Sequence, residues 1–117
     1  MPKPRAELLK GTLDLLILKA LNVRPQHGYG VARWLETSSR ELLRIEEGSL
    51  YPALYRMERR GWIRSEWGQS ETNRKAKFYS LTTKGRSRLE EEASGWERVV
   101  EAVTLILETQ PVESGQA

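Results

Sequence analysis

Apolar residues recur at every third or fourth position in several stretches of the chain, the spacing that places side chains on one face of a helix. The first stretch, about residues 6–22, predicts a helix with a leucine-rich stripe. Leu15 and Leu18 add apolar surface outside that stripe. This pattern favours a central core helix, with a contact between subunits as the alternative. Residues 1–5 hold two prolines and two basic residues and are expected to form a mobile arm.

A turn is predicted over residues 22–30 because this segment contains Pro25, Gly28 and Gly30. His27 lies within it and is most simply a turn residue that hydrogen-bonds to neighbouring backbone. A second helix is expected over about residues 28–37, with three candidate inward residues, Val31, Trp34 and Leu35.

The third helix is predicted to begin at Ser49, whose hydroxyl can accept a backbone N–H of the first turn. Pro52 then falls in the first turn, which tolerates a missing N–H. Gly61 stands where a left-handed residue would end the helix. One apolar stripe follows from the spacing of Leu50, Leu54 and Met57.

The opposite face of this third helix carries two phenols, two guanidiniums and no acid. Its residues are Tyr51, Pro52, Tyr55, Arg56 and Arg59. Such a face suits the floor of a DNA major groove, where arginine can fork onto guanine and hydroxyls can reach phosphates or base edges. A solvated amphipathic helix is the alternative for this stretch taken alone.

After Gly61 the period of the pattern changes. Residues 62–67 alternate loosely and residues 77–81 are aromatic and strand-like, which predicts two strands joined by a polar loop over residues 68–76. A hairpin directly after a helix of this kind is a wing. Its expected tip carries basic residues that can reach phosphates or a minor groove, namely Arg74, Lys75 and Lys77. A solvated turn is the alternative for the loop by itself.

The last long apolar pattern has spacings of four and three, the heptad seam of a helix that packs along another helix. Its members are Leu89, Ala93, Trp96, Val100, Val103 and Leu107. Because one small core cannot cover so broad a face, we expect this helix to pair with its copy in a second subunit. Packing back onto the first helix is the alternative, and the two arrangements are compatible.

The predicted fold class is therefore mainly α with a small β-hairpin (α+β): a winged helix-turn-helix followed by a long C-terminal dimerisation helix. The expected division is a DNA-binding domain over residues 1–82, the dimerisation helix over residues 83–110 and a flexible tail over residues 111–117.

Charge is distributed unevenly along the chain, although the formal net charge is only +3. Residues 56–88 carry a net charge of +7, whereas residues 89–117 carry −6. A basic block beside an acidic helix indicates a polyanionic partner on one surface.

Composition argues against several other functions. The chain of 117 residues has no cysteine and one histidine, so neither a thiolate zinc site nor a cysteine nucleophile is expected, and no metal site, cofactor or enzymatic activity is predicted. No apolar run approaches the ~20 residues that span a bilayer. A cytoplasmic protein without membrane contact is expected.

Several motifs resemble those of the PadR family of bacterial transcriptional regulators. They are GTLDLLIL at residues 11–18, HGYG at 27–30, GSLYPALYRMERRGWI at 48–63 and KFYSLTTKG at 77–85. The resemblance covers about residues 6–109. It implies a homodimeric winged helix-turn-helix repressor that binds an inverted-repeat operator, of the compact type with a single C-terminal helix.

The resemblance also implies roles for individual residues. Ser49, Tyr51, Pro52 and Arg56 match the DNA-facing part of the family motif, and Arg74 and Lys75 match its basic wing. In some compact members a tryptophan of the last helix stacks planar ligands at the dimer interface. Trp96 is a candidate for that role, with an ordinary place in the dimer core as the alternative.

Two further functional hypotheses stand beside the repressor. One is a regulator that senses a planar aromatic small molecule in a pocket between the last helices. The other is a winged-helix module that contacts proteins, which predicts no salt-sensitive affinity for double-stranded DNA.

Overall fold

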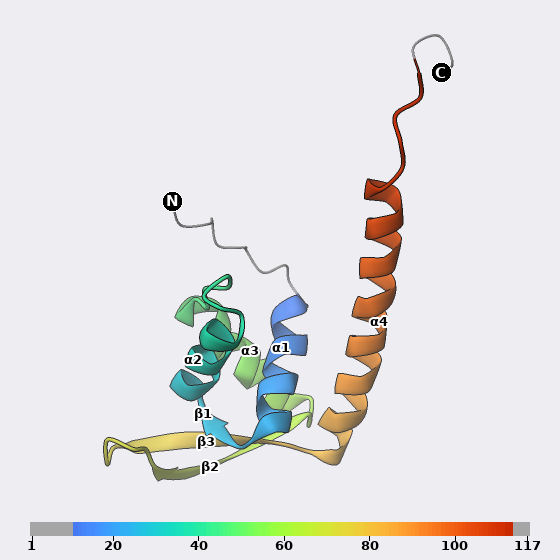
Figure 1. Ribbon diagram of the computed structural model, residues 1–117. Coiled ribbons are helices and arrows are strands. Elements are labelled where there is room, and N and C mark those ends of the chain that lie inside the picture. Colours follow the sequence, from blue (N-terminus) through green and yellow to red (C-terminus); the bar gives the residue numbers. More distant parts are fainter. Residues whose placement is uncertain (1–10, 114–117) are drawn as a thin grey trace.

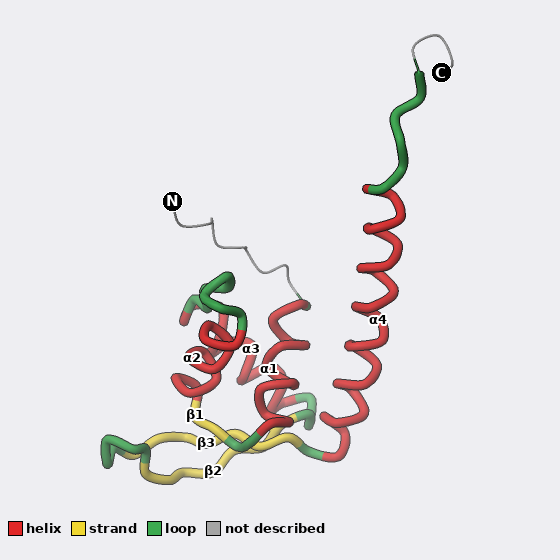
Figure 2. Tube along the Cα trace, viewed as in Figure 1, coloured by secondary structure: helices red, strands yellow, loops and turns green. Residues whose placement is uncertain are grey.

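The computed structural model describes residues 11–113, which form four helices and a small antiparallel sheet (Figures 1 and 2). The elements in chain order are α1 (Thr12–Val23), β1 (Gln26–His27), α2 (Gly28–Ser38), α3 (Glu47–Arg59), β2 (Ile63–Gln69), β3 (Lys75–Leu81) and α4 (Thr83–Leu107). This winged-helix arrangement confirms the predicted α+β class. The predicted mobile arm, the first residues of the predicted helix at 6–22 and the end of the predicted tail lie outside the described residues.

The core lies where α1, α2 and α3 pack together over one side of the sheet. Ile17 and Leu18 of α1 are fully buried, as are Leu54 and Met57 of α3. Helix α1 contacts α2, α3, β3 and α4, so it is the central helix of the core. Its apolar surface on more than one side follows from this position, because each neighbour covers a different part of it.

The predicted turn over residues 22–30 is partly wrong, because it contains the short strand β1. Gln26 pairs with Tyr79 and His27 with Phe78, which gives the sheet the order β1-β3-β2. The buried Gln26 side chain donates a hydrogen bond to the carbonyl of Ala20 (3.0 Å). A two-residue strand has no periodicity, and its partner lies some fifty residues away, so the local pattern does not reveal it.

The predicted start of the third helix is also wrong. Helix α3 begins at Glu47, and the carbonyl of Glu46 accepts hydrogen bonds from the backbone N–H groups of Ser49 and Leu50. Glu46 makes no side-chain cap, and because this turn is exposed, water can satisfy its remaining N–H groups. Pro52 therefore lies inside the helix rather than in its first turn.

The end of α3 follows the prediction. Gly61 has a φ of 77°, a left-handed conformation that suits glycine. The N–H of Trp62 donates to the carbonyl of Met57 and the N–H of Gly61 to that of Glu58, the two bonds of a Schellman motif. This motif turns the chain directly into β2.

Helix α4 leaves the sheet next to α1 and then extends well beyond the rest of the molecule (Figure 1). Thr82 caps its N-terminus by accepting a hydrogen bond from the N–H of Gly85 (3.0 Å). The same hydroxyl lies 2.6 Å from the carbonyl oxygen of Gly61 and 3.0 Å from that of Trp62. One side chain thus ties the start of α4 to the end of α3.

Candidate nucleic-acid interface

The outer face of α3 exposes most of the predicted DNA-facing residues. Ser49, Tyr51, Pro52, Tyr55 and Arg59 are all exposed, and Tyr55 retains 61% of its accessible surface. Arg59 donates a hydrogen bond from Nη1 to the Tyr55 hydroxyl (3.2 Å). The contact orders the long arginine side chain before any ligand arrives, so less conformational entropy remains to be lost on binding.

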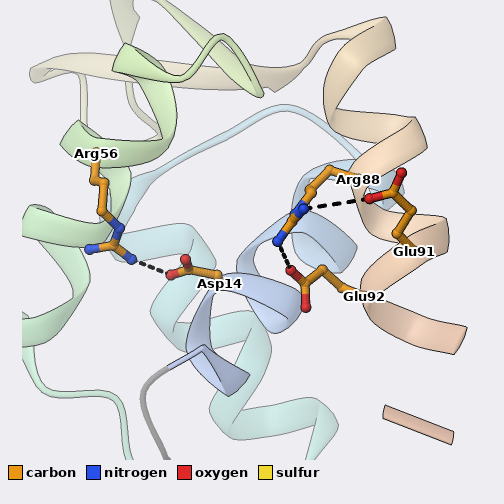
Figure 3. Close-up of polar contacts among 5 residues, drawn as sticks. All are labelled: Asp14, Arg56, Arg88, Glu91 and Glu92. Carbon is orange, nitrogen blue, oxygen red and sulfur yellow. Dashed lines mark hydrogen bonds and ion pairs between the residues drawn. The ribbon is translucent and has the colours of Figure 1, made fainter. Parts of the chain in front are cut away.

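Arg56 occupies a different environment from the one predicted. Its Nη2 donates to the Asp14 carboxylate of α1 at 2.5 Å, and the two side chains are only 38% and 14% exposed (Figure 3). The prediction that this face has no acid holds for α3 alone but is wrong for the folded surface. Asp14 lies in α1, 42 residues before Arg56 in the chain, so helical spacing within α3 does not reveal the pair.

The second half of α3 borders a shallow, open hollow on the surface. It is lined by Tyr55, Arg56, Arg59 and Arg60. Three guanidiniums around one hollow create a positive potential that attracts phosphate oxygens.

The wing is longer and its turn is tighter than predicted. The strands pair from Ile63 opposite Leu81 to Gln69 opposite Lys75, so the predicted loop over residues 68–76 shrinks to residues 70–74. Ser70 and Arg74 close this turn through backbone and side-chain hydrogen bonds, and Asn73 takes a left-handed φ of 63°. Arg74 therefore lies at the tip, as predicted.

The other two predicted tip residues lie along β3. Lys75 begins the strand, and its Nζ lies 5.0 Å from the ring centroid of Trp67. Lys77 lies opposite Trp67, away from the tip, and its Nζ is 3.5 Å from the Glu58 carboxylate of α3. The prediction that Lys77 reaches outward from the tip is therefore wrong, because the longer strand brings it beside α3.

A polar cluster joins α3 to the wing around Tyr79, which is buried. Burial raises the pKa of the Tyr79 phenol, and the neighbouring ammonium of Lys77 partly opposes that rise. Glu58 and Tyr51 contribute smaller upward shifts to the same pKa, so both side chains of α3 act on this strand residue. Glu58 also accepts a hydrogen bond from the Ser65 hydroxyl of β2 (2.6 Å). These contacts fix the orientation of the wing relative to α3.

The predicted seam of α4 is largely uncovered in a single chain. Leu89 packs partly against the core and Ala93 is half-buried, whereas the later members are exposed. The exposed seam residues are Trp96, Val100, Val103 and Leu107, and Val99 and Ile106 lie beside them. A contiguous apolar stripe of this kind on a monomer marks an interaction surface.

Other site types are not found in the described part of the chain. Between residues 11 and 113, no three His, Cys, Asp or Glu side chains cluster so as to hold a metal ion. Of the helices in that range, none is both long and apolar enough to cross a bilayer. His27 instead caps α2, where its Nδ1 accepts a hydrogen bond from the N–H of Gly30 (3.0 Å), the contact with neighbouring backbone expected from the sequence.

Comparisons with known proteins agree with this geometry. The model of the "Transcriptional regulator PadR-like family" matches residues 17–91. A PadR-like transcriptional regulator from Bacillus cereus is 30% identical, with a TM-score of 0.75, and the match covers 90% of this chain and 100% of that one. A transcriptional regulator from Clostridium thermocellum is 27% identical over 85% of this chain and 96% of that one, with a TM-score of 0.77. A PadR family regulator from Eggerthella lenta is 32% identical over 86% of each chain, with a TM-score of 0.74.

Proposed function

The chain belongs to the PadR-like family of transcriptional regulators, and from that premise we propose that it is a homodimeric repressor that binds an inverted-repeat DNA operator. The observation that carries the proposal is the outer face of α3, where exposed phenols and a preorganised arginine stand beside a basic wing. The structurally similar proteins from Clostridium thermocellum and Bacillus cereus are transcriptional regulators, which supports this role.

In the proposed complex α3 enters the major groove. Tyr51, Tyr55 and Arg59 face the bases and phosphates, with Ser49 and Pro52 at the N-terminal end of the same face. Arg56 has a secondary part, because its ion pair with Asp14 already uses one arm of the guanidinium. The wing, with Arg74 and Lys75, lies along the neighbouring minor groove.

Dimerisation through α4 would set the spacing of the two half-sites. The exposed seam supports pairing with a second copy, and a two-fold dimer reads half-sites about one helical turn, or a multiple of it, apart. The acidic charge of residues 89–117 also favours this arrangement, since it repels DNA from α4 and leaves α3 and the wing as the attractive surface. Repression follows if such a dimer occupies a promoter in the bacterial cytoplasm.

A Val103→Asp variant tests the dimer. Aspartate on the seam would leave a charge at the interface, so sedimentation should show dissociation to monomers, whereas Leu105→Asp on the opposite side of α4 should remain dimeric. If both variants sediment like the wild type, the seam does not form the dimer.

DNA binding is tested with a duplex enriched from a random-sequence library by the wild-type protein. Fluorescence anisotropy should give an affinity at least ~10³-fold above that for a scrambled duplex, with a steep salt dependence. Arg59→Ala should weaken binding, while Arg98→Ala on the exposed surface of α4 should not. No enrichment and no salt-sensitive binding would refute the proposal and favour a module that contacts proteins.

A second candidate function is effector sensing between the two copies of α4. The observation that favours it is Trp96, a seam residue whose side chain is 45% exposed in the single chain. A planar aromatic compound that stacks there should quench Trp96 fluorescence, and the response should vanish in Trp96→Phe. A broad panel without any quenching would argue for a purely structural Trp96.

A further inference from the structure

One large apolar side chain of the wing is largely uncovered by the part of the chain that the structure describes. Trp67 of β2 is 64% exposed, although Ile63 and Ser65, which point to the same side of the strand, contact the core or α3. The hairpin continues past the end of the helical layer (Figure 1), and Trp67 is not among the described residues that form the core or pack against it.

On the opposite side of the hairpin, the aromatic residue Phe78 has a structural role and is packed accordingly. Phe78 lies over Gly68, where an added Cβ would come within 3.1 Å of its ring. Its ring also meets the edge of His27 at a centroid distance of 5.3 Å. Gly68 and His27 thus leave Phe78 partly buried. By contrast, the one ring contact of Trp67 among the described residues is the ammonium of Lys75.

The surroundings of Trp67 suit a polyanion. Lys75 lies 5.0 Å from the indole centroid, Lys77 is its cross-strand neighbour, and Arg74 is at the tip. Glu58, which also faces this side, is already engaged by Lys77 and Ser65. The cation over the indole orients the ring at little cost in conformational entropy, since tryptophan has only two side-chain torsions.

We propose that Trp67 is a DNA-contacting residue that reads the shape of the minor groove beside each half-site. This inference rests on the proposed function. The indole lies against the deoxyribose wall of the groove, while Lys75 moves from the ring to an adjacent phosphate. Lys77 and Ser65 both contact Glu58 and so link the hairpin to α3, which fixes the position of Trp67 relative to the major-groove face.

Such a contact distinguishes sequences without hydrogen bonds to bases. Groove width and deformability depend on sequence, so an apolar side chain fitted against the sugars favours flanks that adopt the right width. The specificity supplied by Trp67 should therefore concern base pairs outside those that α3 touches.

The test uses the full-length protein, the enriched duplex and two substitutions, Trp67→Ala and Trp67→Phe. Trp67→Ala should bind about tenfold more weakly, by analogy with other aromatic contacts to nucleic acid, and Trp67→Phe should recover part of the loss. The salt slope should stay unchanged in both, because no charge is removed, whereas Arg59→Ala should reduce it. Because Trp67 is exposed, circular dichroism and the melting temperature should match the wild type.

Hydroxyl-radical footprinting locates the contact. The wild type should protect deoxyriboses that flank each half-site, and Trp67→Ala should lose that protection while keeping the protection at the centre of each half-site. Exchanging A·T-rich for G·C-rich flanks should change the affinity of the wild type more than that of Trp67→Ala. Unchanged affinity, footprint and flank preference in Trp67→Ala would overturn the inference while leaving the proposed function intact. Failure of the wild type to enrich any duplex would instead refute the proposed function on which this inference rests.

Discussion

Replacing Asp14 with alanine separates the two roles that Arg56 can have. If Arg56 mainly ties α3 to α1, the substitution removes a stabilising contact between the two helices. If Arg56 is available to DNA, the same substitution frees a guanidinium at the edge of the proposed interface. The two effects have different readouts, stability and salt-dependent affinity, so both are measurable in one variant.

The expected loss of stability follows from the exposure of the two side chains. Exposed ion pairs contribute about 0.2–1 kcal/mol, whereas removing one partner of a fully buried pair costs about 3–5 kcal/mol. Asp14 is 14% exposed and Arg56 is 38% exposed, so the solvent still screens this pair on the arginine side. We expect Asp14→Ala and Arg56→Ala each to lower the free energy of unfolding by about 1–2 kcal/mol.

Chemical denaturation at a fixed protomer concentration measures this loss, because the stability of a dimer depends on concentration. The double variant should lose less than the sum of the single variants. This double-mutant cycle is needed because Asp14 also lies in the first turn of α1, where a negative charge interacts favourably with the helix dipole. That contribution is present with either residue at position 56, so it cancels in the coupling energy.

DNA affinity supplies the second readout. Asp14→Ala raises the formal net charge of each chain from +3 to +4 and releases Arg56. If each freed side chain takes a phosphate, the slope of log affinity against log salt should become more negative by about 0.9 per half-site, or about 1.8 for the proposed dimer. Strictly additive stability losses would refute the helix tie. An unchanged salt slope would show that Arg56 does not reach DNA even when it is free.

Three further predictions concern the joint between the wing and α4. Gly85→Ala should prevent folding or lower stability severely, because a Cβ there would lie 2.0 Å from the Trp62 carbonyl oxygen. The control is Gly95→Ala, where an added Cβ meets open space, and thermal melts should show that it stabilises α4 by about 0.5–1 kcal/mol. Thr82→Ala should cost about 1–2 kcal/mol in denaturant titrations, and Thr82→Ser, which keeps the capping hydroxyl, should recover most of it. Burial raises the pKa of Tyr79 above its ordinary value of 10.0, because the folded state favours the neutral phenol. The stability that this buried phenol contributes should therefore be fully present below pH 10.0 and fall as the pH rises through the raised pKa. Unfolding at several alkaline pH values should show that decline in the wild type and less of it in Tyr79→Phe; equal declines would contradict the assignment.

Local pattern determined most of the elements of this protein. The stripe of Leu50, Leu54 and Met57 predicted the buried face of α3, and Gly61 predicted its end, because helical spacing and left-handed backbone are properties of neighbouring residues. The alternation on either side of a polar segment likewise predicted the hairpin. Charge along the chain indicated which part of it carries positive potential.

Tertiary structure decided which side chains are available on that surface. The Asp14 partner of Arg56, the Glu58 partner of Lys77 and the pairing of β1 with β3 all join residues far apart in the chain. Spacing within one element cannot reveal such neighbours, since they depend on how helices and strands pack. The exposure of Trp67 has the same origin: alternation assigns it to the side of the strand that faces the helices, and only the packing of the described residues decides that its side chain remains 64% exposed.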